Sequence, residues 1–222
     1  MTVLFVVLTI IFFLGLDWVV QRLKREKRVE AAQPAQPVAA PYPVRTPEGV
    51  FFAKSHTWLN LFPSGRIRLG IDDFVGSLME NPSVVFLKGQ GDSIEKGDPI
   101  LLLEEGEHRL TIRAPLSGEV LALNTDLEKS PNRMREALFS DGWAYTVRPR
   151  SLQDLREMLL GAESRSWMFE ELRRLREMLT GTAAGELATA YIQDGGAPAP
   201  GMLKQLDRVH WQQLEEQFLQ VR

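Results

Sequence analysis

Residues 91–120 read GDSIEKGDPILLLEEGEHRLTIRAPLSGEV, and this stretch decides the fold class. The apolar runs at residues 99–104 and 110–113 flank a charged segment that contains Gly106. Further turn signals, Gly97-Asp98 and Ser117-Gly118, bound the two runs on their outer sides. Short apolar runs separated by such residues are typical of β-strands joined by tight turns. The stretch therefore predicts two neighbouring strands with Gly106 in the turn between them.

The same pattern continues through residues 50–150, which favours a sandwich or a small barrel. Two short helices interrupt it, one at Asp72–Leu78 with Asp72 as N-cap and one around Pro131–Leu138. The strands that we expect are Thr57–Phe62, Arg66–Gly70, Ser83–Phe86, Pro99–Glu104, Leu110–Arg113, Gly118–Leu123 and Ala144–Arg148.

Five motifs in this region resemble those of the glycine cleavage system H protein family, in family order and with similar spacing. The family patterns are S-H-E-W, G-I-T-D-F/Y, G-D-x-V-x-x-G, S-P-V-S-G-E-V followed by N, and G-x-G-W ending in K-P. The matching segments are Lys54–Trp58, Gly70–Phe74, Gly91–Gly97, Ala114–Val120 with Asn124, and Asp141–Trp143 with Arg148-Pro149. The resemblance covers about residues 49–160 and implies a lipoyl/biotinyl-like β-sandwich, also called a barrel-sandwich hybrid.

The chain departs from the family at the residue that carries the lipoyl group. The family places a lysine at a hairpin tip, eight residues before the Pro of S-P-V-S-G, and the same count from Pro115 reaches Glu107. No lysine lies between Lys96 and Lys129. A lipoyl amide needs an amine, so the resemblance implies a fold that is kept without its lipoyl attachment. We therefore expect no cofactor.

The composition points away from several classes of function. The 222 residues include 26 Lys and Arg against 29 Asp and Glu, a formal net charge of −3, so there is no basic excess for binding nucleic acid. The absence of Cys excludes disulfides and thiolate metal sites. Only His56, His108 and His210 remain as imidazole ligands. We expect that the protein is not an enzyme and that it has no catalytic residues and no metal site.

The N-terminal segment predicts a membrane anchor. Residues Val3–Val20 carry no charge except at Asp17, and 18 helical residues would span about 27 Å of a hydrocarbon core about 30 Å thick. A cleaved signal peptide would place basic residues before the apolar run, whereas here they follow it, from Arg22 to Arg28. This distribution predicts an N-terminus outside a bacterial inner membrane and a cytoplasmic C-terminal domain.

The predicted organisation has four parts. A transmembrane helix at residues 1–22 is followed by a basic and then Pro/Ala-rich linker at residues 23–48. The H-like sandwich takes residues 49–150, and residues 151–222 form a helical extension. The fold class is therefore α+β, with one N-terminal transmembrane helix, a lipoyl/biotinyl-like sandwich and C-terminal amphipathic helices.

The C-terminal extension has leucines and aromatic residues at helical spacing. They predict helices around residues 151–160, 167–179, 184–192 and 211–221, the last carrying Trp211, Leu214 and Phe218. These helices could fold back on the sandwich, dock another subunit or, through Arg173, Arg174 and Arg176, touch a membrane surface. The candidate partner-binding residues are Trp167, Trp211 and Phe218.

Three functional hypotheses follow. The favoured one is a membrane-anchored, non-lipoylated scaffold or accessory subunit that tethers and stabilises a larger bacterial membrane complex, for example a photosynthetic or respiratory one. Its partners would be subunits of that complex and the lipid bilayer around residues 3–20. The alternatives are a covalent-group carrier for a membrane-associated enzyme, and a small metal or acid–base site at Glu104, Glu105, Glu107 and His108.

Overall fold

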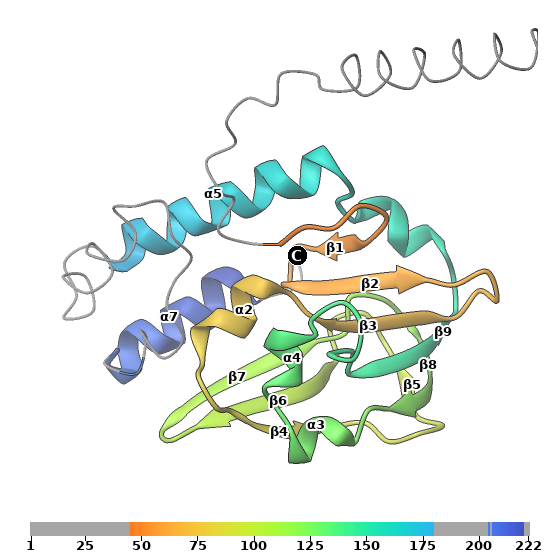
Figure 1. Ribbon diagram of the computed structural model, residues 1–222, viewed down its shortest axis with the longest axis horizontal. Coiled ribbons are helices and arrows are strands. Elements are labelled where there is room, and N and C mark those ends of the chain that lie inside the picture. Colours follow the sequence, from red (N-terminus) through yellow and green to blue (C-terminus); the bar gives the residue numbers. More distant parts are fainter. Residues whose placement is uncertain (1–44, 180–203, 205, 220–222) are drawn as a thin grey trace, which may run out of the picture. The chain divides into compact units, whose positions relative to one another are not determined.

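The computed structural model describes residues 45–179, 204 and 206–219, which form nine strands and several helices (Figure 1). The predicted membrane segment, the linker before residue 45 and the predicted helix at residues 184–192 lie outside these ranges. Among the described residues, no helix has the length and apolarity that crossing a bilayer requires.

Two antiparallel sheets make the sandwich. The larger sheet has the order β1-β2-β3-β9-β8-β5 and the smaller one the order β4-β6-β7. The larger contains β1 (Phe51–Ala53), β2 (Thr57–Leu61), β3 (Ile67–Ile71), β5 (Ser93–Ile94), β8 (Gly118–Leu123) and β9 (Tyr145–Pro149). The smaller contains β4 (Ser83–Phe86), β6 (Pro99–Glu105) and β7 (His108–Arg113).

One apolar core joins the two sheets, because alternate residues of their strands point into it. Tyr145 of β9 also links them through its hydroxyl group, which donates a hydrogen bond of 2.5 Å to the carbonyl of Ile100 in β6. Burial of this phenol raises its pKa to about 12. The β-sandwich that the sequence predicts is the observed fold.

Trp58 and Gly70 show how closely the core is packed. They are directly opposite each other on β2 and β3, and the Trp58 side chain lies across Gly70. A Cβ atom at residue 70 would lie 2.9 Å from the indole ring, closer than packed carbon atoms come. Glycine at this position therefore makes room for a buried tryptophan.

Short helices lie at the margins of the sandwich. They are α2 (Asp73–Leu78), α3 (Asp126–Lys129) and α4 (Arg133–Glu136). The predicted N-cap is confirmed, since the Asp72 carboxylate accepts a 3.1 Å hydrogen bond from the backbone N–H of Val75.

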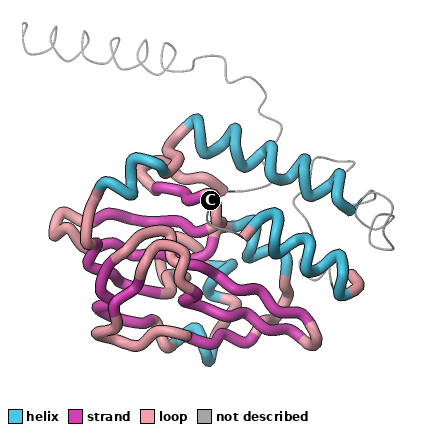
Figure 2. The backbone as a smooth tube through the Cα atoms, turned by 180° about the vertical axis from the view of Figure 1, so that it is seen from behind, coloured by secondary structure: helices cyan, strands magenta, loops and turns pink. Residues whose placement is uncertain are grey.

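The extension after β9 differs in part from the expectation. The first predicted helix is a 3₁₀ segment, η1 (Gln153–Glu157), and the next residues include an isolated bridge between Leu159 and Phe52 of β1. This pairing fixes extended backbone at Leu159 and so prevents a continuous helix. The helices α5 (Ala162–Leu179) and α7 (Arg208–Phe218) follow, and both pack on the sandwich (Figure 2).

Candidate functional site

The β6–β7 hairpin carries the residue that stands in place of a lipoyl-lysine. Its last strand pair is Glu105 with His108, which leaves Gly106 and Glu107 as a two-residue turn. Gly106 has a φ of 62°, a left-handed conformation that glycine adopts without a steric penalty. Glu107 is exposed at this turn. The structure thus places Glu107 at a hairpin tip, which is where the motif count puts it.

The other acidic residues of the hairpin are held apart by different partners. The Glu104 carboxylate lies 2.8 Å from the Arg109 guanidinium on the neighbouring strand. The Glu105 carboxylate instead accepts hydrogen bonds of 2.9 Å from the backbone N–H groups of Glu80 and Asn81. Burial raises the pKa of Glu105, but these two hydrogen bonds and Lys204 outweigh burial and leave the pKa below its usual value. Glu105 therefore acts as an ionised anchor for the chain after α2.

His108 packs against the C-terminal extension of its own chain. Its ring stacks on Trp211 with centroids 4.2 Å apart, and its Nε2 atom lies 3.2 Å from the backbone carbonyl of Lys204. Within the described ranges, no group of three or more His, Cys, Asp or Glu side chains could hold a metal ion. The hairpin acids and His108 are therefore not gathered around one point.

Lys204 brings an amine close to this hairpin from the C-terminal extension. Its Nζ atom lies 2.5 Å from a Glu80 oxygen and 3.4 Å from a Glu105 oxygen. The hydrogen bond to Glu80 holds the pKa of Lys204 above its usual value. The two carboxylates therefore favour the ammonium form of this amine, which is a poor nucleophile.

Helix α7 covers the outer edge of β7. The Trp211 indole N–H donates a 2.7 Å hydrogen bond to the carbonyl of Arg109, and the backbone N–H of Thr111 donates a 2.9 Å hydrogen bond to the Glu215 carboxylate. Trp211 is 5% exposed and Phe218 2%. Both aromatic residues therefore face the sandwich of their own chain, which is the fold-back alternative that the sequence left open. Their binding to a partner stays a prediction and would require α7 to leave this position.

A second buried cluster, around His56, joins α5 and α7 to the sandwich. The His56 ring stacks on Phe74 of α2 with centroids 4.1 Å apart, and Trp167 of α5 lies 5.0 Å away. Its Nδ1 atom is 2.8 Å from the Asp72 carboxylate, and its Nε2 atom, which has no hydrogen-bond partner, is 3.9 Å from Glu171. His56 is fully buried, as expected for a packing residue.

Glu171 also belongs to this cluster, although its charged side chain does not predict burial. It is 7% exposed, and its carboxylate bonds the Arg174 guanidinium at 2.8 Å. Its spacing places it on the same face as Met168 and Leu175, and that alignment was the available signal.

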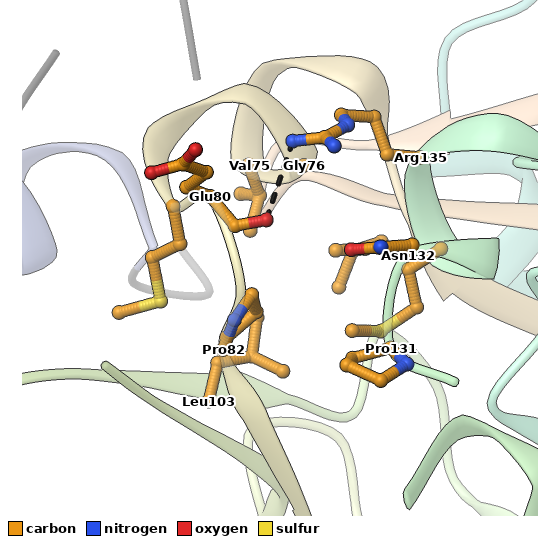
Figure 3. A pocket seen from close by; sticks show the side chains of 11 residues that line it. Val75, Gly76, Glu80, Pro82, Leu103, Pro131, Asn132 and Arg135 are labelled. Carbon is orange, nitrogen blue, oxygen red and sulfur yellow. Dashed lines mark hydrogen bonds between the residues drawn. The ribbon is translucent and has the colours of Figure 1, made fainter. Parts of the chain in front are cut away.

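The cavity at the junction of α2, α4 and the smaller sheet is too small for a cofactor (Figure 3). Val75, Met134 and Leu103 contribute apolar walls, and Arg135 closes one side by donating a 3.3 Å hydrogen bond to the Glu80 carbonyl. The cavity volume is about 10 Å³, close to that of a single water position. It cannot hold a lipoyl group.

The family model and the curated relatives agree on one family. The family model described as glycine cleavage H-protein matches residues 50–171. The H protein of Hydrogenovibrio crunogenus is 34% identical over 113 residues, which are 51% of this chain and 88% of that protein. That of Thermus thermophilus is 31% identical over 114 residues, with the same two coverages of 51% and 88%. The crystal structure of the Mycobacterium marinum H protein is 22% identical, with a TM-score of 0.49, and covers 56% of this chain and 98% of its own.

Proposed function

Because the chain belongs to the glycine cleavage H-protein family, we propose that it is a non-lipoylated member that works as a binding module and not as a carrier. A carrier moves a covalently bound group, whereas a binding module offers only its surface. The module would act as a scaffold or accessory subunit of a larger bacterial membrane complex, photosynthetic or respiratory, at its cytoplasmic face.

The Gly106-Glu107 turn is the observation that carries this proposal. Attachment of lipoate as an amide requires an amine, and the turn offers only the carboxylate of Glu107. The amine of Lys204 is near the hairpin but is engaged by two carboxylates. Neither position supports attachment of a swinging arm.

The arrangement of α7 supports the same proposal. A lipoyl arm has to swing away from its domain in order to reach other proteins, so the hairpin that carries it should not be covered by other parts of the chain. Here the hairpin edge is covered by α7 and the segment beside its tip is held by Lys204. Such a hairpin is suited to a fixed structural role.

The membrane and complex parts of the proposal rest on the sequence. An apolar segment at residues 3–20 followed by basic residues would tether the domain, and the Pro-rich residues 31–47 would hold it away from the bilayer as a semi-rigid spacer. A tethered domain without a mobile arm is suited to positioning other subunits.

Isolation from native membranes in mild detergent tests the scaffold role. We expect the full chain to co-purify with other membrane subunits in fixed stoichiometry, and a variant that lacks residues 1–22 to leave the membrane fraction. Recovery of the full chain as a lone monomer would contradict the proposal. Recovery in the soluble fraction would contradict the tether alone.

A further inference from the structure

Strand β7 lies at the edge of the smaller sheet, so only one of its two sides pairs with another strand. In an antiparallel pair, alternate residues direct their backbone N–H and C=O groups to opposite sides. The carbonyl of Arg109 and the N–H of Thr111 both bond to α7, so these residues face away from β6. A sheet edge of this kind is a template for pairing with another strand.

Helix α7 substitutes for that missing strand with two of its side chains. Trp211 and Glu215 are four residues apart, about 6 Å along a helix, and Arg109 and Thr111 are two residues apart, about 6.7 Å along a strand. The similar spacing lets one indole donor and one carboxylate acceptor satisfy successive backbone groups. The buried Leu214 and Phe218 hold the helix in place.

We propose that β7 is a self-pairing edge that α7 keeps closed, and that its partner when open is β7 of a second copy of this chain. The two strands would pair antiparallel about a two-fold axis at Leu110. The smaller sheets of both copies would then form one sheet with the order β4-β6-β7-β7-β6-β4. Helix α7 thus controls whether the chain associates through this edge.

Charge selects this register. With the axis at Leu110, Arg109 lies opposite Thr111 of the second copy, and Glu107 lies opposite Arg113, so two pairs of opposite charge form. An axis at Thr111 would instead place Arg109 opposite Arg113, and like charges directly opposite each other destabilise a strand pair. The exposure of Glu107 at the turn leaves it accessible to a second copy.

The test measures self-association of the full chain in detergent by sedimentation. The W211F/E215A variant removes both hydrogen bonds to β7 and keeps an aromatic ring at residue 211. We expect its dimer dissociation constant to fall at least about tenfold below that of the native chain, as two edge groups become available. Glu216→Ala changes an exposed residue of the same helix and serves as the control, with the native value expected.

Charge variants in the W211F/E215A background test the register. E107R should weaken the dimer about tenfold, because both opposite-charge pairs become like-charge pairs, and E107R/R113E should restore it. The proposal would be overturned if the folded W211F/E215A chain had the dimer dissociation constant of the native chain. It would also be overturned if adding E107R to W211F/E215A left the dissociation constant unchanged. Should W211F/E215A fail to fold, Glu215→Ala alone frees the N–H of Thr111, and native association of that variant would equally overturn the proposal.

Discussion

Phe218 should hold α7 on the sandwich, and its replacement by alanine is the sharpest test of that packing. The side chain is 2% exposed. Its ring lies 5.3 Å from the ring of Phe74, and the Arg174 guanidinium lies 4.9 Å above it. Phe169 on α5 offers a matched control, because the same substitution there changes a ring that is 55% exposed.

The expected cost of F218A is about 3–5 kcal/mol, the range for a buried phenylalanine truncated to alanine. F169A should change stability by about 0.5 kcal/mol or less. The loss should appear as faster amide hydrogen exchange in α7, with local opening at least about a hundredfold more frequent. Equal exchange rates in the α7 amides of F218A and F169A would refute the packing of α7.

Three further changes test other parts of the structure. Gly70→Ala should destabilise the domain by about 1–3 kcal/mol in urea unfolding, because the added Cβ would lie 2.9 Å from the Trp58 ring. Gly76→Ala is the control and should not destabilise the domain, because the nearest atom to its Cβ would be 3.8 Å away. Equal effects of the two substitutions would contradict the packing at Trp58. Because the pKa of Glu105 is lowered in the folded protein, its ionised carboxylate stabilises the fold at pH values above the ordinary pKa of 4.5, and this stabilisation is lost as the pH falls through the folded pKa. The melting temperature of Glu105→Gln should therefore lack this fall at acidic pH. The same dependence of melting temperature on pH in both proteins would contradict the role of Glu105 as an ionised anchor. Glu107→Lys places an amine at the exposed turn, so a lipoate ligase should add one lipoyl group to this variant and none to the native chain. The mass of each intact chain measures this addition. Addition of a lipoyl group to both chains would contradict the role of residue 107.

The sequence predicted the hairpin and its tip because the signals there are local. Two apolar runs on either side of Gly106 determine the strands, and a single glycine with positive φ determines the turn. The same holds for α2, where Asp72 caps the first turn as its residue type suggests. Residues whose partners are close in the sequence were predicted well.

Contacts between distant segments were not predictable in this way. The leucines at 152, 155 and 159 have helical spacing, yet Leu159 pairs with Phe52, more than a hundred residues earlier. The spacing within one helix left open whether Trp211 faces the sandwich or a partner, and it cannot identify the Arg109 carbonyl to which the indole N–H donates. Glu171 has a charged side chain, which by itself does not predict burial, yet it is 7% exposed and lies 3.9 Å from Nε2 of His56. Tertiary packing decides all three.

The mass of the intact chain, purified from its own cells in detergent, tests most directly whether this H-like protein carries a group. We expect the mass of the unmodified polypeptide, because Glu107 has no amine and the amine of Lys204 is paired with carboxylates. A chain heavier by one lipoyl group, with the added mass located between residues 104 and 109 or at Lys204, would contradict it.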